Sequence, residues 1–462
     1  MKIKIAMSLM FFSVLSTLYG QQSFERLYQY WNYGEGGAVF EEEDGYLLAG
    51  TGVDDLLNKF FLLKVGLNGD TLWMKQVELS NHSGSDPWIR CSLTDGSGNT
   101  CFFVSGVQNM PDFLKFDAQW NLLWKRKLED DFKIQKMVVS DDNNIICVGQ
   151  DSTGYCIRKL DTGGSTIWRS GNIYCNMWGY LSFSSIHEMP DNNIVLISSW
   201  MNNNWFQFNH STITIYGPEG DSLSSSFFDP ESGNFHIFET HLVEDDLLSI
   251  AVSTAMDETT SSLIRHKSDG TILRDILLGP EGSFYKMVKT GDGKLIALGS
   301  TPAVGGIRRM VLHCVTLTGD SLWSSYIGYT RGLSVNDIKY CHDKGILLGG
   351  FAGVNDWPGV HPYFVKTDST GKISPLGISN LPEKSVAVYP NPAYGSVVIE
   401  TPVNFTGQCT IYDSFGRICY SGSLKAEMQT IDLYSLKSGI YVYHITDNQS
   451  VFTGKLMVKA VR

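Results

Sequence analysis

The sequence predicts an all-β protein, and three observations support this prediction. Charged residues make up 18% of the 462 residues, below the roughly 25% of an average soluble protein. Glycine is enriched, with 46 residues in the chain. Short apolar runs, rich in β-branched and aromatic residues, alternate with turns of Gly, Asp and Asn along most of the sequence. This composition and spacing favour many short strands joined by tight turns.

One element recurs along the chain with a nearly constant period. It is a turn followed by an apolar strand that often ends in Trp, and its seven copies begin at Gly69, Trp120, Gly164, Gly220, Gly270, Gly319 and Gly371. Successive copies start 44 to 56 residues apart. A second turn and strand precede each copy, so each repeat has about four short strands, as in a β-propeller blade. The sequence therefore predicts a seven-bladed β-propeller over residues 22–377, with six or eight blades as alternatives.

The first and last parts of this region predict how the ring closes. After Gly371 the chain soon reaches Pro375, which leaves little room for a fourth strand in the last blade. Residues 24–30 have strand character but belong to no complete blade. Because closure removes exposed sheet edges, we expect this N-terminal strand to complete the seventh blade. The repeated Trp73, Trp124, Trp168 and Trp323 are interpreted as structural residues that fill the outer gap between blades.

The N-terminus predicts export. Lys2 and Lys4 precede an apolar run over residues 5–18, and Gly20 follows it, a pattern typical of a secretory signal peptide over residues 1–20. An N-terminal core helix is the alternative. The run is shorter than the roughly 20 residues needed to cross a bilayer, so no membrane span is expected. The formal net charge of −12 argues against a nucleic-acid partner.

The composition changes after the repeats. Residues 378–385 are predicted to be a linker, and residues 386–462 a small antiparallel β-sandwich. The latter region contains Tyr389-Pro390-Asn391-Pro392, Tyr412-Asp413-x-x-Gly416-Arg417, Leu436-x-x-Gly439-Ile440-Tyr441 and Gly454-Lys455. In order and spacing these residues resemble the type A C-terminal sorting domain of the type IX secretion system in Bacteroidota. The repeat region likewise resembles the secreted repeat arrays that accompany such domains.

The resemblance carries several implications. It implies export through the periplasm, recognition of the sorting domain by the type IX machinery, and removal of that domain by a cell-surface transpeptidase. The expected location is the cell surface, attached to the outer membrane, or the extracellular medium. The resemblance of the repeat region implies a fold but no chemistry.

Local motifs for catalysis are missing from the sequence. It contains no H-E-x-x-H, no G-x-S-x-G and no phosphate-binding glycine loop, so no catalytic residue, metal ligand or cofactor is assigned. The acidic stretches 141–144 and 191–193 are interpreted as turns, with calcium binding as the alternative. Nine cysteines are present. Cys91 with Cys101, and Cys147 with Cys156, are either disulfide candidates or buried free thiols.

The longer connections predict where a ligand binds. They combine aromatic and amide residues, and the candidate ligand-binding residues are Trp178, Trp200, Asn203, Trp205, Trp357 and His361. We therefore expect a secreted binding protein whose variable loop face holds a glycan or a surface protein. Because the net charge is acidic, a neutral or weakly charged glycan is favoured. The alternatives are an extracellular carbohydrate-active enzyme, a glycosidase or lyase with its site over the propeller channel, and a structural or adhesive protein.

Overall fold

The computed structural model describes most of the chain beyond the N-terminal segment. The described residues are 23–28, 30, 33–54, 57–80, 87–105, 111–173, 179–202, 207–228, 234–243, 245–255, 258–278, 282–301, 308–330, 333–353, 360–373, 386–401, 405–413, 416–425, 428–446 and 451–459. The predicted signal peptide and linker lie outside these residues.

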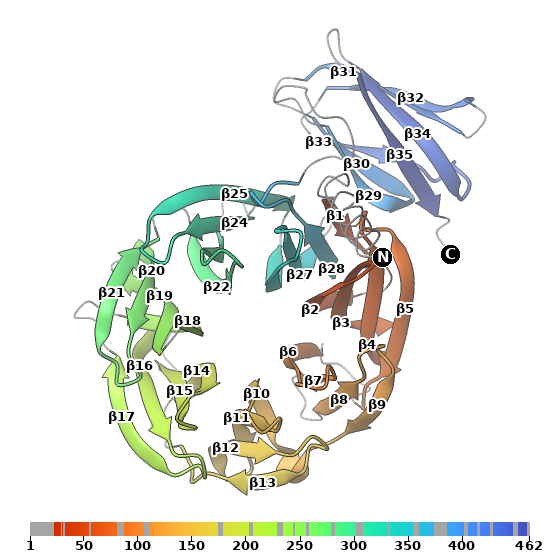
Figure 1. Cartoon of the computed structure of the whole chain (residues 1–462). Helices are drawn as coiled ribbons and strands as arrows, with labels where there is room; N and C mark the ends of the chain where they lie inside the picture. The colour runs from red at the N-terminus through yellow and green to blue at the C-terminus, as the bar shows by residue number, and fades with distance from the viewer. Residues whose placement is uncertain are drawn as a thin grey trace, which may run out of the picture.

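The repeats fold into seven four-stranded antiparallel sheets, arranged in a ring as in a β-propeller (Figure 1). The first three blades consist of β2 (Tyr33–Glu42), β3 (Gly45–Asp54), β4 (Leu57–Gly66) and β5 (Thr71–Glu78); β6 (Trp88–Thr94), β7 (Thr100–Ser105), β8 (Asp112–Phe116) and β9 (Leu122–Arg126); and β10 (Lys133–Val139), β11 (Ile145–Asp151), β12 (Gly154–Leu160) and β13 (Thr166–Arg169). A short 3-10 helix, Glu129–Asp131, precedes β10.

The next three blades repeat this order. They consist of β14 (Gly179–Glu188), β15 (Ile194–Asn202), β16 (Gln207–Tyr216) and β17 (Ser222–Phe228); β18 (Asn234–Val243), β19 (Asp246–Ala255), β20 (Glu258–His266) and β21 (Ile272–Leu277); and β22 (Ser283–Lys289), β23 (Leu295–Ser300), β24 (Arg308–Val315) and β25 (Ser321–Thr330). The first strand of each blade lies nearest the centre of the ring (Figure 1).

The seventh blade is closed by the N-terminus of the described chain. Its strands are β26 (Ser334–Tyr340), β27 (Ile346–Gly353), β28 (Val360–Lys366) and β1 (Phe24–Leu27). Strand β1 pairs antiparallel with β28, with Phe24 opposite Lys366. The predicted ring closure is therefore confirmed.

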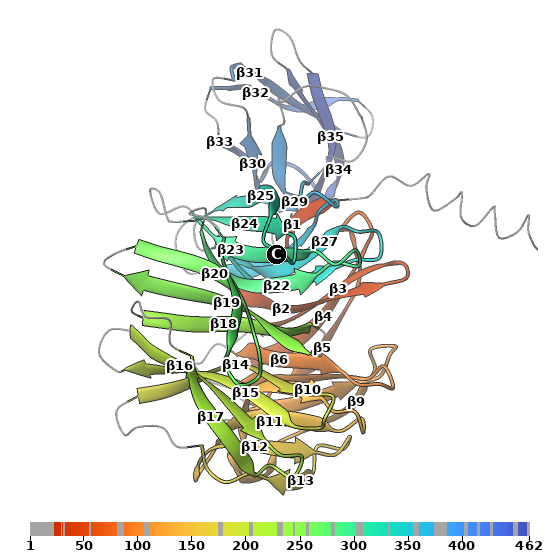
Figure 2. The ribbon, with the colours of Figure 1, turned by 60° about the vertical axis from the view of Figure 1, so that its left-hand side comes forward.

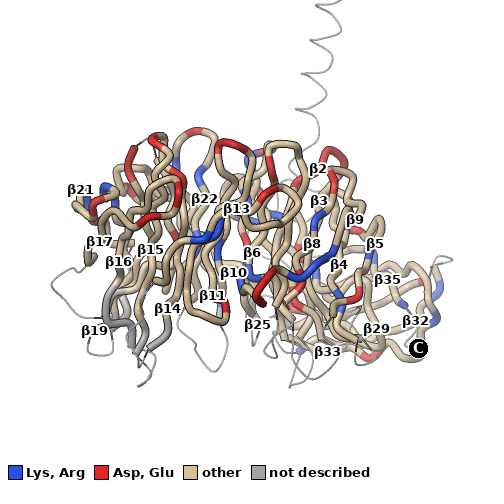
Figure 3. The backbone as a smooth tube through the Cα atoms, turned by 90° about the horizontal axis from the view of Figure 1, so that it is seen from below, with Lys and Arg blue, Asp and Glu red and all other residues tan. Residues whose placement is uncertain are grey.

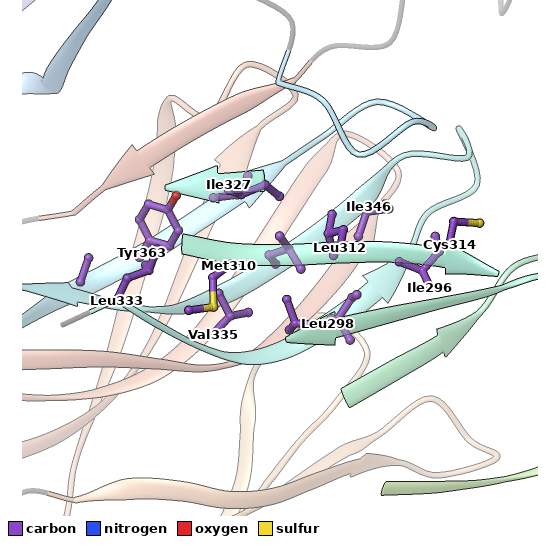
Figure 4. Packing of buried hydrophobic residues seen from close by; sticks show 14 residues of the cluster. Ile296, Leu298, Met310, Leu312, Cys314, Ile327, Leu333, Val335, Ile346 and Tyr363 are labelled. Carbon is purple, nitrogen blue, oxygen red and sulfur yellow. The ribbon is translucent and has the colours of Figure 1, made fainter. Parts of the chain in front are cut away.

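Apolar packing between blades holds the ring together. Among the described residues, each of the seven interfaces between neighbouring sheets contains one apolar core. Figure 4 shows the core between the sixth and seventh blades, where Leu298 and Leu312 face Val335 and Ile346. Each sheet is buried on both faces, so a blade gains most of its stability from its two neighbours.

The repeated glycine and Trp residues meet across these interfaces. A side chain at Gly220, in the fourth blade, would approach the ring of Trp168 in the third to 2.6 Å. Gly371 in the seventh blade has the same relation to Trp323 in the sixth, at 2.8 Å. Both glycines have positive φ, so the turn needs glycine for conformation and for space. The predicted structural role is confirmed for Trp168 and Trp323, and Trp73 and Trp124 also pack against the cores between blades.

The eight cysteines in the described residues are all free thiols, and most are buried. Cys91, Cys101, Cys147 and Cys156 all belong to the apolar core between the second and third blades. Cys101 lies opposite Leu93 and not opposite Cys91. The interpretation as buried free thiols is therefore confirmed for Cys101, Cys147 and Cys156, while Cys91 is a partly buried free thiol and Cys175 lies outside the described residues.

The C-terminal region forms a single seven-stranded sheet. Its strands are β29 (Ala387–Tyr394), β30 (Ser396–Glu400), β31 (Gly407–Tyr412), β32 (Ile418–Leu424), β33 (Met428–Asp432), β34 (Gly439–Thr446) and β35 (Val451–Lys459). The predicted sandwich is not confirmed, because β29 pairs antiparallel with β30 and parallel with β35 and so joins all strands into one sheet. Ile399 of β30 and Ile411 of β31 nevertheless share one core.

The C-terminal sheet lies beside the closing strand β1 (Figures 1 and 2). Arg26 of β1 donates a hydrogen bond from Nη1 to the carbonyl oxygen of Asn391 at 2.6 Å. Its Nη2 lies 3.5 Å from Asp70 of the first blade. The ammonium of Lys459 lies over the ring of Tyr30, 5.6 Å from its centre. The closing strand thus contacts the seventh blade, the first blade and the C-terminal sheet.

Phe24→Ala tests the closing strand. Phe24 is 4% exposed and its ring lies 5.6 Å from that of Phe364 and 5.9 Å from that of Tyr46. The substitution should lower the free energy of unfolding by about 3 to 5 kcal/mol, because it removes a buried ring at the point of closure. Urea titration of the full chain measures this value. Leu72→Ala, at a side chain that is 53% exposed, is the control; equal effects of the two substitutions would contradict the assignment.

Candidate functional site

The innermost strands share one irregularity. Each of β2, β6, β10, β14, β18, β22 and β26 has a register shift against the second strand of its blade. The residues skipped by these β-bulges are Gly37, Arg90, Gln135, Ser184, Phe238, Tyr285 and Asn336. Bulges redirect side chains and are frequent next to functional sites. Here they recur at the same place in all seven blades.

We call the residues that directly follow the bulges the axial ring. They are Ala38, Cys91, Lys136, Ser185, Glu239, Lys286 and Asp337. Each lies on an innermost strand, and the four charged members are partly exposed. Since the seven positions are equivalent in the fold, their differences in charge and size make the centre of the ring chemically asymmetric.

Two members of the axial ring join neighbouring blades. The carboxylate of Glu239 accepts a hydrogen bond from the backbone N–H of Met287 in the next blade, at 2.7 Å. The carboxylate of Asp337 accepts one from Val39 in the first blade, at 3.0 Å. In both cases the donor is the residue that follows the axial position of the next blade. The same interaction therefore occurs at two of the seven interfaces.

Two bulged residues add a second connection between blades. The amide Nδ2 of Asn336 donates a hydrogen bond to the carbonyl oxygen of Gly36 at 2.8 Å. The hydroxyl of Ser184 donates to the carbonyl oxygen of Ile237. Gly36 and Ile237 each precede the bulge of their own strand, so these bonds are also equivalent. Polar groups near the axis thus hold the inner strands together.

The charges of the axial ring influence one another. Burial alone would raise the pKa of Glu239, but Lys286 and His241 lower it to about 2. Burial opposes the charge of Lys286 as well, but Glu239 and Asp337 outweigh this effect and raise its pKa. Burial raises the pKa of Asp337. Burial, followed by repulsion from Lys286, lowers the pKa of Lys136. Lys286 is thus matched by two carboxylates, while Lys136 is the less favourably placed cation.

Two histidines near the axis are neutral at neutral pH. Burial, followed by His241, lowers the pKa of His187 to about 4. Burial, followed by Lys136, lowers the pKa of His236 to about 3. Neutral imidazoles can donate and accept hydrogen bonds but contribute no positive charge. These two histidines therefore add no positive charge near the axis.

The candidate ligand-binding residues predicted from the sequence are only partly described. Trp178, Asn203, Trp205 and Trp357 lie outside the described residues. Trp200 lies in β15 opposite Leu181 and packs against the core between the third and fourth blades. His361 lies in β28 opposite Ala352, and burial lowers its pKa. Trp200 and His361 are on different blades, the fourth and the seventh, and no contact brings them together.

The acidic stretches form turns on the rim opposite the longer connections. The carboxylate of Asp142 accepts hydrogen bonds from Ser140 and from the backbone of Asn144, and that of Asp191 accepts one from the backbone of Asn193 at 3.0 Å. The interpretation of these stretches as turns is therefore confirmed. Figure 3 shows Asp and Glu gathered along this rim.

One group on the acidic rim has the composition of a metal site. Glu41, Cys341 and Asp343 place their potential ligand atoms within 4.8 Å of one another. Glu41 already accepts a hydrogen bond from the backbone of His342, and Asp343 pairs with Lys366 at 2.8 Å. Both carboxylates thus have partners within the protein, and the group carries no assignment.

The residues of the C-terminal sequence pattern come together in the structure. The side chain of Asn391 donates to the carbonyl oxygen of Lys455 at 2.7 Å and accepts from the backbone of Met457 at 2.8 Å. Tyr441 donates to the carbonyl oxygen of Lys437 at 2.8 Å. The other residues of the pattern are placed as follows: Tyr389, Pro390 and Pro392 in β29, Gly416 in a turn, Gly439 in β34 and Gly454 in β35. Asn391 thus links the first part of the pattern to the last.

Glu239→Gln should remove a pH-dependent part of the stability. The folded-state pKa of Glu239 is about 2 and the ordinary value is 4.5, so its stabilising effect is complete above the ordinary value and is lost as the pH falls towards 2. This effect amounts to roughly 3 kcal/mol. Gln keeps an oxygen for the N–H of Met287 but has no charge. The free energy of unfolding, measured by urea titration from neutral to acid pH, should therefore fall less steeply in the variant.

Asp337→Asn is the matched comparison for Glu239→Gln. Because burial raises the pKa of Asp337, its pH-dependent contribution has the opposite sign and is lost as the pH rises through that pKa. If the free energy of unfolding falls equally steeply at acid pH in Glu239→Gln and in the wild type, this would contradict the charge arrangement described for the axial ring.

The comparisons with solved structures agree with the ring of sheets. An ulvan lyase from a new family of polysaccharide lyases has a TM-score of 0.53 and 9% identity, over 75% of this chain and 97% of that chain. The virginiamycin B lyase from Staphylococcus aureus has a TM-score of 0.46 and 12% identity, over 75% and 99%. A protein of unknown function from Bacteroides caccae has a TM-score of 0.38 and 15% identity, over 56% and 87%. The first of these likenesses supports the fold and no further property.

The comparison of the sequence identifies the C-terminal region. No curated protein matches the chain. Residues 387–459 match the secretion system C-terminal sorting domain. In the described residues, no helix has the length and hydropathy of a membrane span. Residues 387–459 therefore form a type IX sorting domain, which marks this propeller-like protein for export to the cell surface or the extracellular space.

Proposed function

We propose that the protein is a secreted binding module that holds a glycan or a surface protein on one rim of the ring. The observation that carries this proposal is the difference between the two rims. On the acidic rim every connection between strands of one blade has five residues or fewer. On the other rim the connections range from two to nine residues. Binding sites are commonly built from variable loops on a rigid scaffold, so this loop rim is the favoured surface.

The sequence positions of the six candidate ligand-binding residues support this proposal. Trp178, Asn203, Trp205 and Trp357 belong to its connections by their position in the sequence, between strands of known bounds. Trp200 and His361 lie near the ends of β15 and β28 that face the same rim. Aromatic rings pack against the C–H faces of sugars, while amides and imidazoles bind their hydroxyl groups. The set therefore suits a carbohydrate.

Catalysis is the second candidate function. The axial carboxylates have pKa values pushed in opposite directions, lowered for Glu239 and raised for Asp337, as in the acid and base of a glycosidase. The ulvan lyase also shows that this fold can support polysaccharide cleavage in another protein. Both carboxylates, however, already accept backbone hydrogen bonds from the next blade. A structural role accounts for them, so binding is the favoured function.

Trp205→Ala and Trp357→Ala test the binding site. The full chain, applied to a glycan array, should bind a small set of related glycans. Loss of one stacking ring should weaken binding by roughly 2- to 150-fold, which corresponds to about 0.5 to 3 kcal/mol. Trp73→Ala, on the outer strand of the first blade, is the control and should leave the set of bound glycans unchanged. Binding that neither loop variant weakens would contradict the loop-rim site, and release of reducing ends or unsaturated sugars would favour the enzyme.

The proposal for export extends to the fate of the sorting domain. We expect the folded domain to be recognised by the type IX machinery and then removed by a surface transpeptidase. This proposal is supported by the match of residues 387–459. It is also supported by the way Asn391 joins both ends of the sequence pattern.

Asn391→Ala should reduce export across the outer membrane. It removes two hydrogen bonds that join β29 to β35 and should destabilise the sorting domain by about 1 to 3 kcal/mol. In the native host, the variant should accumulate in the periplasm, as measured by cell fractionation and immunoblot. Gln408→Ala, at an exposed amide of β31, is the control. Normal surface or medium levels of a chain that lacks residues 386–462 would contradict the proposed route.

A further inference from the structure

The interface between the third and fourth blades differs from the two interfaces that an axial carboxylate bridges. At two other interfaces an axial carboxylate, Glu239 or Asp337, accepts the N–H of the residue after the next axial position. The equivalent donor in the fourth blade is Ile186, which lies opposite Leu196. Met287 lies opposite Ala297, and Val39 lies opposite Leu48, in the same way. The axial residue that precedes Ile186 around the ring, however, is Lys136.

Lys136 faces the fourth blade. It lies opposite Val148 in the register of its own blade, and Val148 belongs to the core between the third and fourth blades. By the same test Glu239 faces the sixth blade, since Ile250 opposite it belongs to the core between the fifth and sixth. At the interface between the third and fourth blades, the ammonium of Lys136 is a hydrogen-bond donor. At two other interfaces the same position holds a carboxylate, which accepts a hydrogen bond from a backbone N–H. Two donors that face one another require an acceptor between them.

Lys136 differs from the other lysines of low exposure in lacking an ion pair among the described residues. Other buried lysines are paired: Lys64 with Asp44 at 2.7 Å, Lys115 with Asp95 at 2.9 Å, and Lys366 with Asp343 at 2.8 Å. Lys136 has no ion-pair partner in the part of the chain that the structure describes. Lys286, the other axial lysine, is attracted by two carboxylates. Lys136 is also partly exposed, so a solute at the centre of the ring can reach it.

A second polar group lies at the next axial position. Ser185 is 7% exposed, and its hydroxyl oxygen has no hydrogen-bond partner among the described residues. Buried hydroxyl groups are usually hydrogen-bonded, and an unsatisfied one is costly. Ser185 lies opposite Ile197, which belongs to the core between the fourth and fifth blades, so its hydroxyl faces the next interface and Lys136 is the axial side-chain donor at this one.

We propose that this part of the axial ring binds the carboxylate of an acidic sugar, between the ammonium of Lys136 and the N–H of Ile186. The carboxylate of the ligand takes the place that Glu239 and Asp337 fill at their own interfaces. This inference deepens the proposed glycan-binding function and rests on it. It also changes the expected ligand: an acidic net charge of −12 disfavours a polyanion at long range, but a local lysine without an ion pair among the described residues selects a carboxylate at contact distance.

The bulges explain why the site is at the axis. They lie near the middle of each innermost strand or closer to its first residue, and these strands begin at the loop rim. A sugar held by aromatic residues of that rim can therefore extend an acidic unit towards Lys136. The aromatic residues would supply most of the contact area, and the axial ring would select the charge of the ligand.

Titration calorimetry on the full chain tests the site. The probes are sodium glucuronate, sodium acetate and glucose. Glucuronate should bind, and Lys136→Met should weaken its binding by roughly ten- to hundredfold, because a hydrogen bond to a charged group is lost. Lys136→Glu should abolish binding and leave the melting temperature no lower than that of the wild type, since the new carboxylate can accept the N–H of Ile186. Lys289→Glu makes the same charge change at an exposed residue and should retain binding.

The probes separate failure of this site from failure of the proposed function. Binding of acetate without glucuronate would support a carboxylate site but overturn the acidic sugar as its ligand. Binding of neither carboxylate, or glucuronate binding that both Lys136 variants retain, would overturn the site. Binding of neutral glycans on the array would in that case still support the loop rim. Equal binding of glucose and glucuronate would also overturn the site, because it would show no selection for the carboxylate.

Discussion

Burial of apolar side chains between neighbouring sheets is the interaction on which this structure depends. A single blade presents an apolar surface on both faces, so it can be stable only between two others. The ring satisfies this requirement seven times, once at each interface. The outer gap widens with distance from the axis, and a large ring against a glycine, as in Trp168 and Gly220, fills it. The period of the sequence is the direct result of this packing.

The same architecture restricts what polar groups can do near the axis. The innermost strands have one edge without a partner strand, and their bulges leave further backbone groups unpaired. Glu239 and Asp337 satisfy two of these groups in the next blade. A carboxylate near the axis is thus explained by stability before any chemistry is invoked. Lys136 occupies the same position in its blade as Glu239 and Asp337 do in theirs. Because an ammonium group is a donor, Lys136 cannot accept a hydrogen bond from the next blade.

The sequence alone predicts the fold well and the centre of the ring poorly. The repeated turns and the strand character of residues 24–30 predicted seven blades and their closure, and both follow from local residue types. Lys136, Glu239, Lys286 and Asp337 share no motif, because each comes from a different repeat. These four residues are recognised as equivalent only when the repeats are aligned at the β-bulges of their innermost strands. The parallel pairing of β29 with β35, which joins the C-terminal strands into one sheet, likewise leaves no local signal.

The position of Arg26 links the sorting domain to the closure of the ring. This residue belongs to one of the earliest strands to be synthesised, while its partner Asn391 lies in the sorting pattern near the end. In the folded chain the two meet beside the strand that closes the ring. The sorting domain therefore contacts the ring at the strand that closes it. A chain whose first strand is not paired with β28 would lack this surface, so the contact between the sorting domain and the ring depends on closure of the ring.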